Sequence, residues 1–156
     1  MPLDTATFAE LMSSELTISQ QLFNLLQQEL DAVQQQNTTK LETLNAAKAQ
    51  RVNNLKEQAA HRLKWMQFHE LPLTPECLHH PDIVQNTPIL DLWQQLAAQY
   101  DLNRQISERL SEMVLALRFR TEQKLRILHA RQNDPNLYNE DGKTAGAQPG
   151  FKSIEA

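Results

Sequence analysis

Glycine and proline are so unevenly distributed along this 156-residue chain that they restrict the folds open to it. All three glycines lie after residue 141, and two long spans, residues 3–71 and 89–134, contain neither glycine nor proline. Both residue types interrupt regular structure, and the spans that lack them are rich in good helix formers such as Leu, Gln, Glu, Ala, Lys and Arg. We therefore predict an all-α fold and exclude β-sandwiches, βαβ nucleotide folds and disulfide scaffolds.

Apolar residues recur at helical spacing in three segments, which predict helices over about 5–36, 39–70 and 88–132. The proline-rich segment 71–87 between the last two is expected to be a connection. The pattern is typical of an elongated antiparallel three-helix bundle, a coiled-coil hairpin plus a long third helix, in one domain over residues 1–133. One continuous helix in place of the hairpin is the alternative, because no strong breaker separates the first two segments.

Local signals give the expected helix ends. Asn37 can adopt a left-handed conformation and end the first helix, and Thr39 with Glu42 has the spacing of a capping box for the second. Thr87 followed by Pro88 is typical of the start of a helix, which places the beginning of the third.

The third helix is expected to be longer than its partners, so its far end would lack a full set of neighbours. Its seam is polar near Asn103 and Ser107 and apolar beyond them. The apolar positions that follow could form a groove offered to another protein, and these are Leu110, Val114, Leu117, Leu125 and Leu128. The alternative is that they pack inside this chain or in a homodimer.

Residues suited to catalysis or metal binding are scarce. The single cysteine, Cys77, lies near His79 and His80, but adjacent histidines cannot easily ligate one ion. The absence of glycine before residue 142 excludes a P-loop, a dinucleotide-binding turn and a nucleophile elbow in the body of the chain. We predict no catalytic residue, no metal, no cofactor and no enzyme activity.

Charge and hydropathy indicate the compartment and the kind of partner. The net charge is −4, which does not favour nucleic acid as the main partner. The one basic run, from Arg118 to Arg131, is interpreted as favourable charge near a helix C-terminus and as attraction to an acidic segment or partner, with nucleic-acid contact as the alternative. No secretory signal and no membrane span are recognisable, so we expect a cytoplasmic location without direct membrane insertion.

The tail, residues 134–156, loses the apolar periodicity and is expected to be disordered when free. It contains the isolated apolar pair Leu137-Tyr138 just before a turn-like segment that includes Asp141 and Gly142. Such a pair can serve as a short docking motif, and a tail that folds back on the body is the alternative.

Several segments together resemble the FlgN family of flagellar type III export chaperones. The most specific is the tail motif Asn136-Leu137-Tyr138-Asn139-Glu140-Asp141-Gly142-Lys143-Thr144, and weaker matches are Trp93-Gln94-Gln95-Leu96, Asp101-Leu102-Asn103, and Glu29, Leu44 and Lys48. The chain departs from the family pattern at Ile106-Ser107, where Asn-Gly is common, and at Asn139, where the family has a smaller residue.

The resemblance implies a cytoplasmic chaperone that binds the C-terminal helices of the hook–filament junction proteins FlgK and FlgL before export. It assigns client binding to the second half of the third helix. It assigns docking on the export gate protein FlhA to the tail, that is to Leu137, Tyr138, Asp141 and Gly142. The alternative is a structural coiled-coil or homodimeric scaffold without a client, and weak self-association is compatible with either function.

Overall fold

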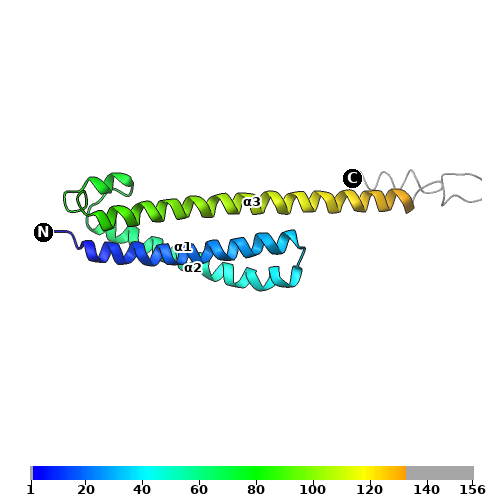
Figure 1. The fold of residues 1–156 in the computed structure, drawn as a ribbon, viewed down its shortest axis with the longest axis horizontal. Helices are drawn as coiled ribbons and strands as arrows, with labels where there is room; N and C mark the ends of the chain where they lie inside the picture. The colour runs from blue at the N-terminus through cyan, green and yellow to red at the C-terminus, as the bar shows by residue number, and fades with distance from the viewer. Residues whose placement is uncertain (1, 133–156) are drawn as a thin grey trace, which may run out of the picture. The chain divides into compact units, whose positions relative to one another are not determined.

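The computed structural model describes residues 2–132, which form three α-helices and one short 3₁₀ helix and contain no strand (Figure 1). The α-helices are α1 (Thr5–Gln34), α2 (Thr38–Phe68) and α3 (Thr87–Gln132), and the 3₁₀ helix is η1 (Pro75–His79). The all-α prediction is confirmed, and each helix begins and ends within two residues of its predicted bounds. The chain divides into two compact units, Met1–Ser111 and Glu112–Ala156.

The first two helices form the hairpin rather than one continuous helix. α1 and α2 lie side by side and run in opposite directions (Figure 1). The residue with a left-handed conformation in the turn between them is Gln36, whose φ is 54°. The sequence analysis had predicted this conformation for Asn37. Asn37 has a φ of −86° and caps α2, since its side chain accepts a hydrogen bond from the Lys40 backbone N–H. The prediction was therefore wrong by one residue about where the left-handed position falls.

Asp and Asn side chains cap all three α-helices. The Asp4 carboxylate accepts a hydrogen bond from the Thr7 backbone N–H, and the hydroxyl and backbone of Thr7 hold the pKa of Asp4 below its usual value. Asn86 accepts a hydrogen bond from the Ile89 N–H at the start of α3. Each cap satisfies a donor that the first turn of a helix leaves without an intrahelical partner.

The core of the first unit is densest where the connection meets the helices. Phe8, Met66, Cys77, Ile83 and Ile89 are buried there, and they come from α1, α2, the connection and the beginning of α3. The ring of Phe8 stacks on Trp65 with centroids 4.8 Å apart. The connection is thus part of the core, and burial raises the pKa of its Cys77 thiol.

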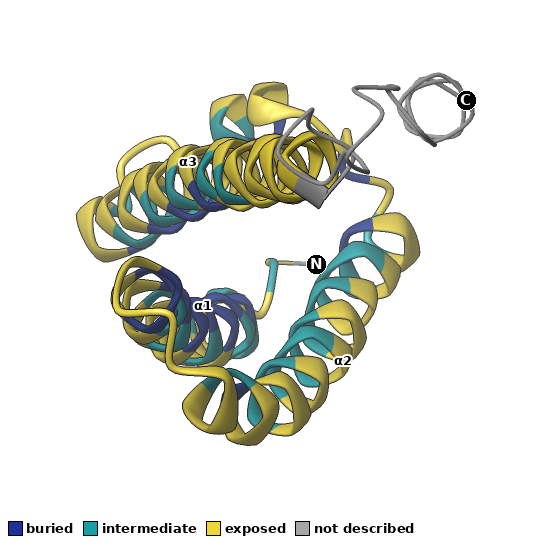
Figure 2. Cartoon of the chain, turned by 90° about the vertical axis from the view of Figure 1, so that its right-hand side faces the viewer, coloured by how far each residue is buried: buried dark blue, intermediate teal, exposed yellow. Residues whose placement is uncertain are grey.

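Burial is unequal among the helices of the first unit (Figure 2). α1 carries ten buried residues, whereas α2 has only Leu44 and Met66 buried and is otherwise intermediate or exposed. α1 is therefore the central helix of this unit. On α3, Asn103 and Leu110 are buried but Ser107 is exposed, so the prediction that Ser107 belongs to the seam was wrong.

Candidate partner-binding surface

The described part of the second unit is one stretch of α3 whose apolar side chains face solvent. Between Glu112 and Arg131 no residue is buried, although the stretch is rich in large apolar side chains. The exposed fractions run from 38 to 60 %, and the residues are Val114, Leu115, Phe119, Leu125, Ile127 and Leu128. Exposure on this scale, concentrated in one segment, is typical of surfaces that bind another protein.

Helical periodicity places part of this set on one face. Val114, Leu117, Leu125 and Leu128 are separated by three, eight and three residues, so at 3.6 residues per turn they form one stripe. We call these four residues the apolar stripe. Leu115 and Phe119 lie on the other side of the helix, which makes them natural controls for the stripe.

Leu110 differs from the other four predicted client-binding residues. Its side chain is only 6 % exposed and belongs to the first unit. Val114, Leu125 and Leu128 are between 38 and 53 % exposed, and Leu117 is intermediate. As the molecule stands, the apolar stripe presents surface to a partner and Leu110 does not.

The charged side chains of α3 are also arranged differently in its two parts. Arg104, in the first unit, forms ion pairs with Asp101 at 2.6 Å and with Glu108 at 2.9 Å. These contacts lower the pKa of Asp101 and raise that of Arg104. Among residues 2–132, no ion pair forms at Arg120 or Lys124.

A cluster of polar side chains joins the three α-helices of the first unit. The buried Glu15 carboxylate accepts hydrogen bonds from Arg62 Nε and from the Tyr100 hydroxyl, both at 2.7 Å. The guanidinium of Arg62 also lies 5.8 Å from the centre of the Trp93 ring. A carboxylate held in this way joins three helices and is not available to a substrate.

This cluster escaped the sequence analysis, although a signal for it was present. Glu15 stands three residues after Met12 and one before Leu16, on the face where α1 is buried. An acidic residue on a buried face needs a partner, because an isolated buried charge is costly. The polar seam, in contrast, was predicted in part: Asn103 donates hydrogen bonds to the hydroxyl and the carbonyl of Ser19, at 2.9 and 3.0 Å.

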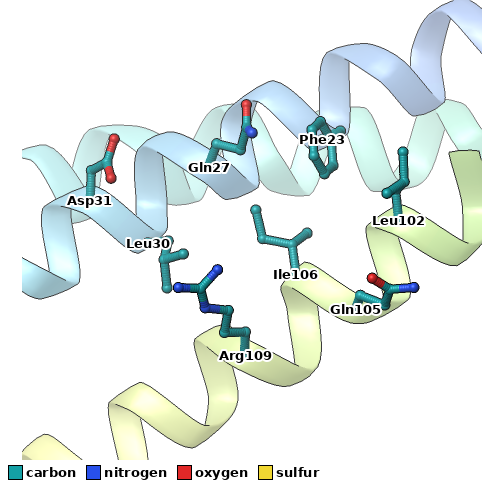
Figure 3. Close-up of a pocket in the computed structure, with 8 residues that line it drawn as sticks. All are labelled: Phe23, Gln27, Leu30, Asp31, Leu102, Gln105, Ile106 and Arg109. Atoms are coloured by element: carbon teal, nitrogen blue, oxygen red, sulfur yellow. The ribbon is translucent and has the colours of Figure 1, made fainter.

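A surface groove lies between the second half of α1 and the stretch of α3 from Leu102 to Arg109 (Figure 3). Its volume is about 460 Å³. Apolar, amide and charged side chains line it together, namely Phe23, Gln27, Leu30, Asp31, Leu102, Gln105, Ile106 and Arg109. The groove carries charges of both signs, Asp31 from α1 and Arg109 from α3, and so it does not favour a ligand of one charge.

Comparison with protein families identifies the chain. A family model described as FlgN protein matches residues 1–146. The chain belongs to the FlgN family. FlgN-family proteins are flagellar export chaperones, which agrees with exposed apolar surface on a helical scaffold. Comparison with curated proteins and with solved structures gave no match.

Three residues quoted for the resemblance to the FlgN family come together in the hairpin. Lys48 Nζ lies 3.1 Å from Oε2 of Glu29, and the Leu44 side chain, one turn before Lys48, is buried. They join α1 to α2 near the turn, which gives them a role in holding the hairpin. The resemblance also drew on tail residues, and the predicted docking residues Leu137, Tyr138, Asp141 and Gly142 lie outside the described residues.

No α-helix within residues 2–132 has a stretch long and apolar enough for a membrane span. The same residues contain no group of three or more His, Cys, Asp or Glu side chains placed to hold a metal ion.

Proposed function

We propose that this chain binds the C-terminal helices of the hook–filament junction proteins FlgK and FlgL in the cytoplasm. It covers their apolar faces, prevents aggregation or premature assembly, and delivers them to the export gate protein FlhA. Membership of the FlgN family supports the general role of flagellar export chaperone. The specific clients and the delivery step are the proposal.

The observation that carries client binding is the exposed apolar stripe. An amphipathic helix can be recognised by an apolar surface that meets anchors spaced three, four and seven residues apart. Val114, Leu117, Leu125 and Leu128, at intervals of three, eight and three residues, lie on one side of α3 and offer such an apolar surface. Removal of apolar surface from water contributes about 25 cal/mol per Å², and much of this contribution offsets the cost of association and of ordering a client helix.

Delivery is assigned to the tail by the family resemblance. We propose that Tyr138, with Leu137, Asp141 and Gly142, contacts FlhA while the apolar stripe holds the client. Client binding and gate docking then use separate parts of the chain.

Calorimetry with C-terminal fragments of FlgK and FlgL tests client binding. Leu128→Ala, in the stripe, should weaken binding roughly tenfold, which corresponds to the loss of about 1.4 kcal/mol when an apolar anchor is truncated. Leu115→Ala is the matched control, since Leu115 is similarly exposed but lies off the stripe. Equal losses for both variants, or no binding by the unmodified chain, would contradict the proposed client site.

The tail is tested separately. Tyr138→Ala should leave the affinity for the client fragments unchanged and reduce binding to FlhA and swimming motility. An equal loss of client binding would show that the two tasks are not divided between stripe and tail. Capture from a flagellated-cell extract of nothing but a second copy of this chain would favour the scaffold alternative.

A further inference from the structure

One edge of the apolar stripe carries three basic residues. Arg120 lies three residues after Leu117, and Lys124 lies seven residues after it. Lys124 also lies four residues before Leu128, and Arg131 lies three residues after Leu128. Residues three, four or seven apart in a helix are neighbours on its surface. Arg120, Lys124 and Arg131 therefore line one side of the stripe, and we call them the basic edge. All three are exposed.

No acidic residue of the helix neutralises the central part of this edge. The positions three and four residues away from Arg120 and Lys124 hold Ala, Leu, Gln, Thr and Ile, apart from the two basic residues themselves. Arg120 and Lys124 are four apart, a spacing at which like charges destabilise a helix. Arg118 and Arg126, in contrast, each have Glu122 four residues away.

The charge of this segment also bears on what can cover the stripe. Residues 112–131 contain five basic and two acidic side chains, so a second copy would bring a second excess of positive charge. In an antiparallel pair of copies related by a two-fold axis, each basic edge would face its own counterpart. Like-charge contacts of this kind suppress pairing, as edge residues do in coiled coils.

We propose that the basic edge selects, for the apolar stripe, a partner helix that carries Asp or Glu beside its own apolar face. The stripe supplies affinity, and Arg120, Lys124 and Arg131 determine which amphipathic helices are accepted. This inference rests on the proposed function, in that the stripe is the client site, and it adds the chemistry of the client surface. It also predicts that the stripe pairs poorly with another copy of this chain.

Two helical peptides test the selection directly against the full chain. Both carry the same apolar heptad stripe, and the flanking positions are Glu in one and Lys in the other. By fluorescence anisotropy, the Glu-flanked peptide should bind roughly tenfold more tightly at low salt, because several edge pairs contribute together. The gap should narrow as salt is added. Equal affinity of the two peptides would overturn the proposal.

Matched charge reversals locate the effect on the helix. Lys124→Glu should weaken binding of the Glu-flanked peptide several-fold and strengthen binding of the Lys-flanked one. Arg126→Glu makes the same change in net charge on the other side of the helix and should leave the ratio of the two affinities unchanged. An equal change of the ratio in both variants would mean that total charge, and not the basic edge, makes the selection. Circular dichroism confirms that both variants remain helical.

Two further measurements separate the possible failures. If client fragments bind the unmodified chain but the two peptides are not distinguished, the proposed function stands and the edge selection is wrong. If the peptides are distinguished but no client fragment binds, the proposed function fails and the edge selection stands. Displacement of the Glu-flanked peptide by a single-stranded RNA oligonucleotide, with a steep salt dependence, would assign the basic edge to nucleic acid and overturn the proposal.

Discussion

The two parts of α3 are built from similar residues and have opposite environments. Up to Ser111, Leu96, Asn103 and Leu110 are buried, whereas no residue from Glu112 to Arg131 is buried. Helix propensity does not separate the two parts, since the good helix formers Leu, Ala and Arg recur in both. The difference is burial among the described residues, since apolar side chains of the first part are buried and those of the second are exposed. In the first part such residues stabilise the fold, and in the second they are available to a partner.

Two charged groups, one from each unit, show a similar contrast. The Glu15 carboxylate is fully buried and receives hydrogen bonds from two side chains, whereas Lys124 is exposed and forms no ion pair among residues 2–132. A buried charge needs a partner within the fold, because an unpaired buried charge destabilises the protein. An exposed charge is solvated by water and can remain unpaired at little cost in free energy. Matched substitutions at one buried and one exposed position test this contrast.

The largest contrast is expected between two phenylalanines. Phe8 is fully buried against Trp65, whereas Phe119 is 58 % exposed. Phe8→Ala should lower the free energy of unfolding by about 4 kcal/mol, because it leaves a cavity in the core. Phe119→Ala should change it by about 0.5 kcal/mol or less. Urea denaturation gives both values, and a loss of several kcal/mol at Phe119 would show that this ring packs inside the chain.

A second contrast concerns charge. Glu15→Ala leaves the Arg62 guanidinium largely buried and unpaired, so unfolding should become easier by about 3 kcal/mol. Lys124→Ala should have almost no effect on stability, because the side chain is exposed. Replacing the whole cluster with Glu15→Met, Arg62→Met and Tyr100→Phe should restore much of the loss. A triple variant as unstable as Glu15→Ala would mean that the cost arises from packing.

The helices were predictable because their signals are local. The absence of glycine and proline over two spans and the spacing of the apolar residues gave the three helices, and short polar residues marked their ends. The capping residues were less certain because Asp or Asn stands close to Thr at each helix start. Asn37 could end α1 or begin α2, and the left-handed Gln36 together with the hydrogen bond from the Lys40 N–H to the Asn37 side chain shows that it begins α2.

Contacts between side chains of different helices were not predictable, because they depend on how the helices are aligned along their axes. Glu15, Arg62 and Tyr100 lie far apart in the sequence, and their meeting requires the alignment of α1, α2 and α3. Leu110 and Val114 are four residues apart and lie on the same face of α3, yet Leu110 is buried and Val114 is exposed. Apolar periodicity indicates which face of a helix is apolar. It does not indicate at which residue along that face the contacts with neighbouring helices end.

A smaller effect is expected for two polar residues that both occupy apolar positions of α3. Asn103 is buried and donates two hydrogen bonds to Ser19, whereas Thr121 is exposed and donates only to the Leu117 carbonyl of its own helix. Asn103→Ala should destabilise the fold by about 2 kcal/mol, because it leaves Ser19 without its partner. Thr121→Ala should be neutral or slightly stabilising, since alanine favours helices. Thermal unfolding of both variants makes the comparison, and a larger loss at Thr121 would contradict it.

The last contrast uses alkaline pH, because the Tyr100 hydroxyl can donate its hydrogen bond to Glu15 only while it is protonated. Burial, together with the hydrogen bond to the Glu15 carboxylate, raises the pKa of Tyr100 above its ordinary value of 10.0. The stabilisation that accompanies a raised pKa is complete below the unfolded value and is lost as pH rises above it toward the folded value. The unmodified chain should therefore lose stability above about pH 10 more steeply than Tyr100→Phe, as measured by urea midpoints across that range. The Tyr138→Phe variant retains Tyr100 as its sole tyrosine, so ultraviolet titration follows this phenol alone. Ionisation of Tyr100 at its ordinary pKa would show that the hydroxyl is not held between the helices. That result would contradict the close packing of the first part of α3.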